Sequence, residues 1–160
     1  MTVIISGEQL RTILFGTRVA RATAALPQSA AAAIFTVSGG RVLLTGILGE
    51  VTTTVQNQTC NTKLVANPTT GSDVDLCATV DIANLEVGGK LSLIPDLDAT
   101  PFSVALGKQL AGAAPFGLAN RAVVVAAGTI DLSCSASNTG SVKWDLTYLP
   151  LDAGAAVTAA

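Results

Sequence analysis

The stretch that decides the fold lies in the last third of the chain and reads GTIDLSCSASNTGSVKWDLTYLPLDAGAAV, residues 128–157. Apolar and polar residues alternate on both sides of SNTGS, which is the period-two pattern of strands with one buried face. The pattern predicts an antiparallel hairpin in which Trp144 packs roughly over Cys134 and Pro150 ends the second strand. The predicted apolar face consists of Ile130, Leu132, Cys134, Ala136, Val142, Trp144, Leu146 and Tyr148.

The polar face of this hairpin carries no recognisable chemistry. The chain has no histidine, so a Ser or Cys nucleophile with a His base is excluded. Two pairs of acids, Asp73 with Asp75 and Asp96 with Asp98, have the spacing to share a calcium ion, but solvated turn acids are the favoured interpretation because neither pair has enough ligands. We therefore expect no catalytic residue, no metal, no cofactor and no enzyme activity.

Working outward, short strands separated by turns fill residues 30–150. AAIFTV (32–37) and RVLLTGIL (41–48) flank a predicted tight turn at Ser38–Gly40, and NPTTGS (67–72) predicts another turn before DVDLCATVDI (73–82). Residues 84–98 are expected to hold a turn and a strand, and residues 99–120 a short helix or an irregular excursion. These spacings predict a mainly β domain, an antiparallel β-sandwich or small β-barrel with one N-terminal α-helix.

The N-terminal residues predict the single helix. Met1–Ile5 are β-like, and Ser6 stands three residues before Gln9, the arrangement of a capping box. An apolar stripe then runs from Leu10 through Ile13 and Leu14, with Thr17 and Ala20 as possible extensions, and Pro27 ends the helix if nothing earlier does.

Three arginines, Arg11, Arg18 and Arg21, would line one side of this helix at offsets of seven and ten. A solvated helix face is the favoured interpretation. The alternative is a basic edge that docks on an acidic partner. Together with Ala159 and Ala160 in the C-terminal tail, these arginines are the candidate partner contacts.

The three cysteines, Cys60, Cys77 and Cys134, form neither a zinc motif nor a secreted disulfide framework. Folding the chain at residues 67–72 would bring Cys60 nearly opposite Cys77, and a reduced, packed pair is favoured over a disulfide.

Composition excludes several classes of function. Charged residues make up 12% of the chain, about half the usual share, so we expect partners to cover part of the surface. A net charge of −2 argues against nucleic acid, and aromatics at 4% argue against stacking platforms for bases or sugars. Apolar runs are too short to cross a membrane, and no signal peptide is evident, which predicts synthesis in the cytoplasm.

The pattern of residues 128–157 resembles the closing segment of small virion proteins of tailed bacteriophages, with a strand, an SxTG-type turn, a W-x-L-x-Y-x-P-L strand and a Gly/Ala-rich tail. The resemblance covers about thirty residues. It implies a head decoration (cement) protein that binds the major capsid protein and stabilises the shell of the virion. Such proteins cluster at local symmetry axes, which favours a homo-oligomer, with a trimer foremost.

Two alternatives remain open: a phage tail, neck or fibre-base component, and, from another class, a β-sandwich module that binds sugar or peptide. The chain is expected to form one domain over residues 1–160, with a strand and helix in 1–27, the sandwich or barrel in 30–150 and a tail in 151–160.

Overall fold

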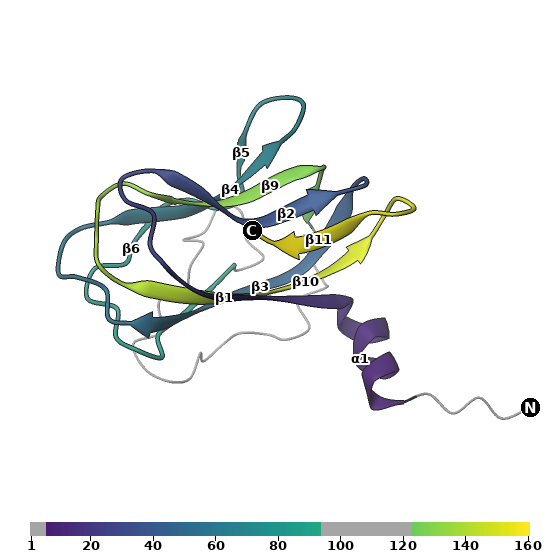
Figure 1. Ribbon diagram of the computed structural model, residues 1–160, viewed down its shortest axis with the longest axis horizontal. Helices are drawn as coiled ribbons and strands as arrows, with labels where there is room; N and C mark the ends of the chain where they lie inside the picture. The colour runs from purple at the N-terminus through teal and green to yellow at the C-terminus, as the bar shows by residue number, and fades with distance from the viewer. Residues whose placement is uncertain (1–5, 94–122) are drawn as a thin grey trace, which may run out of the picture.

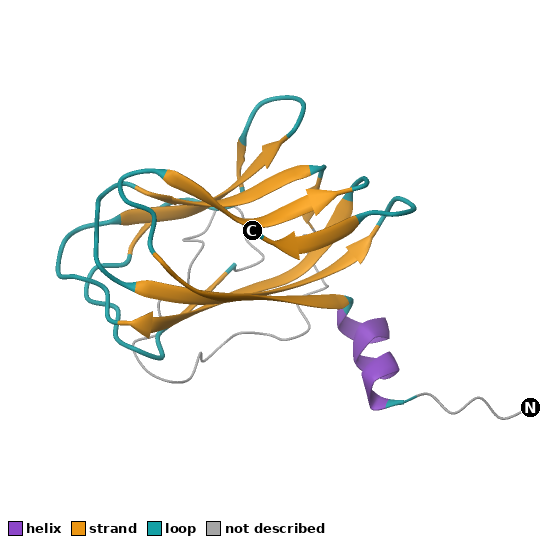
Figure 2. Ribbon diagram, in the orientation of Figure 1, coloured by secondary structure: helices purple, strands orange, loops and turns teal. Residues whose placement is uncertain are grey.

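The protein is a sandwich of two antiparallel sheets, as predicted, with one short helix at the N-terminal end (Figure 1, Figure 2). The computed structural model describes residues 6–93 and 123–160. The predictions for Met1–Ile5, for Asp96 and Asp98, and for residues 99–120 lie outside the described residues.

The first sheet contains the strands in the order β1-β10-β3-β7, and β8 also pairs with β3. Its members are β1 (Thr17–Ala25), β3 (Val42–Thr53), β7 (Lys90–Ser92), β8 (Val123–Val125) and β10 (Ser141–Pro150). β10 lies in the middle, with β1 along one side and β3 along the other. β1 forms an edge of this sheet.

The second sheet has the order β11-β2-β9-β4-β5, and β6 also pairs with β4. Its members are β2 (Ala31–Ser38), β4 (Asn61–Pro68), β5 (Val74–Asp75), β6 (Val80–Asp81), β9 (Gly128–Cys134) and β11 (Ala156–Ala159). The predicted turn at residues 67–72 is confirmed, since β4 and β5 pair across it. The predicted C-terminal tail is in part a strand, because β11 pairs with β2.

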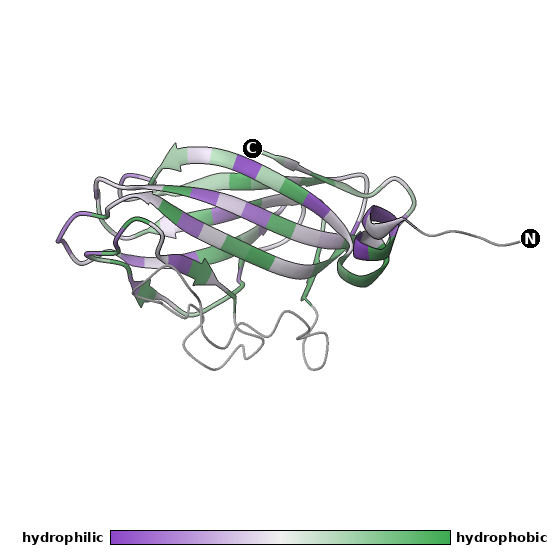
Figure 3. Ribbon diagram, turned by 90° about the horizontal axis from the view of Figure 1, so that it is seen from below, coloured by the Kyte–Doolittle hydropathy of each residue, from purple (hydrophilic) through white to green (hydrophobic). Residues whose placement is uncertain are grey.

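One core fills the space between the sheets. Hydrophilic and hydrophobic residues alternate along the long strands (Figure 3), and most of the apolar residues in the alternating positions are buried. The predicted inward positions on β10 are confirmed as buried, and Trp144 is 1% exposed. The largest fully buried side chains are Trp144, Phe35, Leu64, Ile82, Leu85, Leu91, Ile130 and Leu146.

The two predicted hairpins around SNTGS and SGG are wrong, because both connections cross from one sheet to the other. β9 and β10 belong to different sheets, and so do β2 and β3. Trp144 therefore lies between Arg21 and Gly49 in its own sheet, whereas Cys134 lies opposite Thr62 in the other sheet. Alternation identifies the buried face of a strand, but both inner faces of a sandwich alternate alike, so the pattern does not reveal the neighbouring strand.

The N-terminal helix is shorter than predicted. α1 (Gly7–Phe15) begins with the predicted capping box, in which the Ser6 hydroxyl accepts from Gln9 N and the Gln9 side chain accepts from Ser6 N. It ends at Gly16, whose φ of +86° suits glycine, well before Pro27. The following residues, TRVARATAA, form β1, so Thr17, Arg18, Ala20 and Arg21 are strand residues.

The prediction that Cys60 and Cys77 pack opposite each other is also wrong. Cys77 Sγ accepts a hydrogen bond from Leu64 N at 3.1 Å, while Cys60 lies beside Thr62 and Asp81. The cause is that β6 pairs with the start of β4 and β5 with its end, which separates the two thiols along the strand. All three cysteines are free and buried.

Candidate functional site

The prediction that three arginines line one side of a helix is wrong, because the chain changes from helix to strand between Arg11 and Arg18. Arg11 lies on α1 and is exposed. Arg18 lies on the outer face of β1, where its Nε donates to Asp145 Oδ1 of β10 at 2.8 Å. Whether these side chains also contact another protein stays a prediction.

Arg21 has a different position from Arg18, because it lies on the inward side of β1. It is the cross-strand neighbour of buried Trp144, and its Nε donates to the main-chain oxygen of Ala160 at 3.0 Å. β1 is an edge strand of one sheet, and Ala160 follows β11, an edge strand of the other. This bond therefore bridges the two sheets on the side of the sandwich where these two edge strands lie.

The tail residues Ala159 and Ala160 contact the chain's own second sheet. Ala159 is paired with Phe35 of β2, and Ala160 N donates to Ile34 O at 3.2 Å. These contacts fix the tail within the molecule, and a further role at a partner surface stays a prediction.

The apolar stripe of α1 is exposed in the structure. Leu10, Ile13 and Leu14 are 49%, 65% and 48% exposed, and α1 has no buried residue. Figure 1 shows the helix projecting from one end of the sandwich, and Figure 3 shows hydrophobic residues on it. Three neighbouring large apolar side chains thus lie exposed on a projecting helix.

The base of the helix is fixed to the sandwich. Thr45 Oγ1 of β3 donates to Phe15 O at 2.6 Å. Gly16 N caps the helix itself by donating to Thr12 O at 2.9 Å. A Cβ on Gly16 would lie 2.2 Å from Tyr148 O, so only glycine allows the chain to pass this close to β10. These contacts hold the C-terminal end of α1 against β3 and β10.

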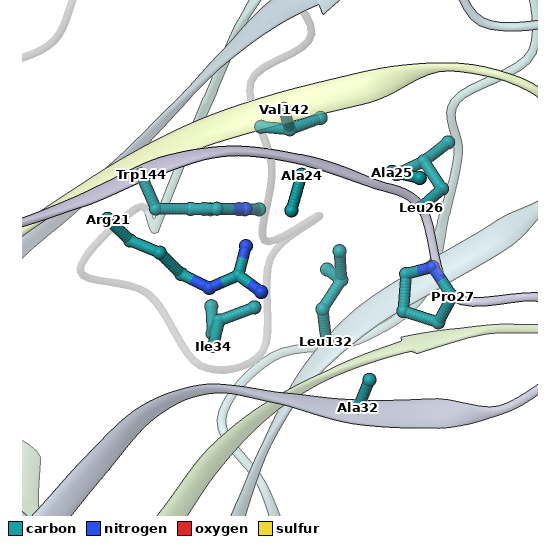
Figure 4. A pocket seen from close by; sticks show the side chains of 10 residues that line it. All are labelled: Arg21, Ala24, Ala25, Leu26, Pro27, Ala32, Ile34, Leu132, Val142 and Trp144. Carbon is teal, nitrogen blue, oxygen red and sulfur yellow. The ribbon is translucent and has the colours of Figure 1, made fainter. Parts of the chain in front are cut away.

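A small cleft lies at the other end of β1, between the two sheets. Its volume is about 60 Å³, and Figure 4 shows Arg21 pointing into it beside Trp144, with Leu26 and Pro27 at its far end. Pockets that enclose a small molecule have roughly 300–1,000 Å³. Trp144 and Tyr148 are both buried, so neither presents a ring face for a sugar.

The thiols of Cys134 and Cys77 are poor nucleophiles in this structure. Burial raises the pKa of the Cys134 thiol to about 12, and burial also raises the pKa of Cys77. Among residues 6–93 and 123–160, no group of three or more His, Cys, Asp or Glu residues could hold a metal ion. In the predicted pair of Asp73 and Asp75, Asp75 forms an ion pair with Lys63, with 2.6 Å between Oδ2 and Nζ, and Asp73 is exposed.

Two features were missed by the sequence analysis. Arg41 holds Asp152 through its main-chain N, Nε and a terminal nitrogen, which joins the β2–β3 connection to the β10–β11 connection. The cleft combines residues from four strands and the segment after β1. Neither has a local sequence signal, since the residues involved are far apart in the chain.

Comparison with protein-family models, with curated proteins and with solved structures finds no match for this chain. No helix within the described residues is long and apolar enough to cross a membrane.

Proposed function

We propose that this chain is a non-enzymatic structural protein of a bacteriophage particle, a head decoration protein that binds the major capsid protein and stabilises the shell. In this proposal it works as a homo-oligomer, with a trimer favoured, and resides in the virion. The observation that carries it is the exposed apolar stripe of α1 on a helix that projects from the sandwich.

The stripe supports an assembly role because exposed apolar area is a source of binding free energy. Covering apolar surface contributes about 25 cal/mol per Å², less the entropy lost on docking. Leu10, Ile13 and Leu14 are about half exposed or more, so a partner that covers them removes a substantial apolar area from water. The low share of charged residues, 12%, is in keeping with a surface that other chains cover.

The resemblance of residues 128–157 to phage virion proteins supports the class of particle. Those residues form β9, β10 and the start of β11, and their inward side chains are central to the core. The cleft, at about 60 Å³, gives less support to a sugar- or peptide-binding module.

The test uses purified phage shells that lack accessory proteins. The purified chain is added, and bound protein is measured after sedimentation, together with the temperature at which the shells release their contents. We expect saturable binding at a fixed ratio to the capsid protein and a higher release temperature. Binding only to isolated tails would favour the tail or neck alternative, and binding to neither would contradict the proposal.

A further inference from the structure

We propose that the cleft beside β1 binds a carboxylate group on a short aliphatic stem, with the guanidinium of Arg21 as its anchor. A free small acid, such as acetate or propionate, has this chemistry, and so does the side chain of an acidic residue of another molecule. The cleft lies in the sandwich and not on α1, so the inference is independent of the surface that carries the proposed function.

The side chain of Arg21 has unused hydrogen-bond donors. Its Nε donates to Ala160 O at 3.0 Å, and this is the one hydrogen bond that the described residues give to the Arg21 side chain. A guanidinium has five N–H donors in a planar fork, so both terminal nitrogens remain available. Figure 4 shows them at the end of the side chain that points into the cleft, between Trp144 and Ile34.

The walls of the cleft do not neutralise this charge. Ten residues line the cleft, and those other than Arg21 are all Ala, Leu, Pro, Ile, Val or Trp. A cation that faces apolar side chains without an acceptor is unfavourable, so the space in front of Arg21 suits a polar occupant. A carboxylate fits best, because its two oxygens accept parallel hydrogen bonds from the two terminal nitrogens.

The other arginines of the sandwich already have such a partner within the chain. Arg18 binds Asp145 through Nε and a terminal nitrogen, and Arg41 binds Asp152 in the same way. Both of these arginines are exposed, whereas Arg21 is half-buried and has no carboxylate among the described residues. Arg21 therefore has the position and the free donors to take a carboxylate from outside.

The size of the cleft limits the ligand. Its volume of about 60 Å³ equals that of about two water molecules, at roughly 30 Å³ each. Ile34, Leu132 and Trp144 are buried and form its floor, and Ala25 and Ala32 are exposed and mark its mouth. A carboxylate on Arg21 would leave room for a stem of about one or two carbon atoms, which the apolar floor would cover.

The experiment uses Trp144 as its reporter, since it lines the cleft and is the one tryptophan of the chain. Its fluorescence and its indole N–H resonance are followed while sodium acetate or propionate is added at constant ionic strength. We expect a saturable change in the millimolar range, and none with sodium chloride or with the neutral analogue propionamide. An equal change with chloride, or no saturable change with either carboxylate, would overturn the inference.

Two variants of the full chain locate the binding. Arg21→Lys keeps the charge but loses the planar fork, so propionate should bind at least about tenfold more weakly. Arg18→Lys is its control, since Arg18 lies on the outer face of β1. Unchanged propionate binding by Arg21→Lys would overturn the inference.

The second variant covers the case in which Arg21→Lys fails to fold. Ala32→Leu fills the mouth of the cleft and leaves the guanidinium in place, so it should abolish the binding. Ala31→Leu is its control, because Ala31 pairs with Ser133 on the outer face, whereas Ala32 pairs with inward Leu132. Equal propionate binding by the two variants would overturn the inference.

A blocked amino acid distinguishes the two sources of the carboxylate. The glutamate side chain in N-acetylglutamate α-amide ends in the same group but carries a bulky backbone. Binding at least as tight as that of propionate assigns the cleft to an acidic side chain of another molecule, and much weaker binding assigns it to a free acid. A chain that binds phage shells but no carboxylate loses this inference and keeps the proposed function, and the reverse result separates them equally.

Discussion

At the scale of single residues, the fit between Trp144 and Gly49 organises the first sheet. The two residues are paired across β10 and β3, and a Cβ on Gly49 would lie 2.8 Å from the indole ring. The large ring is accommodated because its neighbour has no side chain. The missing Cβ of Gly49 thus leaves room for the indole of Trp144 to lie over β3.

Trp144→Ala should lower the free energy of unfolding by about 3–5 kcal/mol, because it leaves a cavity in a closed core. Native Trp144 fluorescence should be blue-shifted and poorly quenched by iodide, since the side chain is 1% exposed. Urea unfolding measures the first effect, and Lys143→Ala, one residue away on the outer face, is the control. Strong quenching in the native state would contradict the buried position.

Gly49→Ala should destabilise the protein by about 1–3 kcal/mol, because the added methyl group overlaps the indole and forces a shift of strand or ring. Thermal unfolding provides the measurement. Gly7→Ala is the matched control, since a Cβ there has no neighbour within 4 Å. Equal stability of both variants would mean that the ring moves without cost.

The interaction of Asp152 with Arg41 should make the stability of the fold depend on pH. Hydrogen bonds from Arg41 lower its pKa from an ordinary value of 3.8 to about 2 in the folded protein. A lowered folded-state pKa stabilises the fold above the unfolded pKa, and this contribution is lost as the pH falls from about 4 to 2. Asp152→Asn should flatten the decline in stability over this range, measured as melting temperature against pH.

Arg41→Gln should flatten the same range less than Asp152→Asn does, because the main-chain N of residue 41 still donates to Asp152. The double variant should behave like Asp152→Asn alone, because that substitution already removes the whole interaction. If the melting temperature of Asp152→Asn falls between pH 4 and 2 as steeply as that of the unmodified protein, the prediction is wrong.

At the scale of elements, the edge strand β1 has two different faces. Arg18 is on the outer face with Asp145, and Arg21 is on the inner side, bonded to Ala160 across the gap between the sheets. The same residue type therefore contributes to a surface ion pair in one place and to closure of the sandwich in the other. Surface ion pairs of this kind contribute about 0–1 kcal/mol.

Arg21→Gln should therefore destabilise the fold more than Arg18→Gln. We expect about 1–2 kcal/mol at position 21, because the bond between the sheets is lost and apolar neighbours are exposed, and less than about 1 kcal/mol at position 18. Urea unfolding of the two variants, which are each other's control, measures the difference. The opposite order would mean that the Arg21 bond does not form in solution.

At the scale of the whole molecule, one apolar core holds both sheets together. Core side chains come from both sheets and from the connections between them, and the three cysteines within it are free. The chain alternates between sheets along much of its length, so most of the described connections cross from one sheet to the other. The described thiols therefore add no covalent cross-link to this packing.

A chelator and a reducing agent together should leave the melting temperature nearly unchanged, because the described thiols are unpaired and buried. Scanning calorimetry with and without both reagents makes the comparison. A drop of about ten degrees, which corresponds to roughly 3 kcal/mol in a chain of this size, would reveal a stabilising metal or disulfide.

The sequence alone determined which side chains of β10 are buried and where α1 begins. Alternation on β10 identified Val142, Trp144, Leu146 and Tyr148 as inward, and the capping box identified the helix start, because both signals involve neighbours in the chain. The tertiary structure decided which strands pair, where Arg21 points and which thiols are neighbours. Those features depend on which sheet receives each strand, and contacts between residues a hundred positions apart, such as Arg41 with Asp152, leave no periodic trace in the sequence.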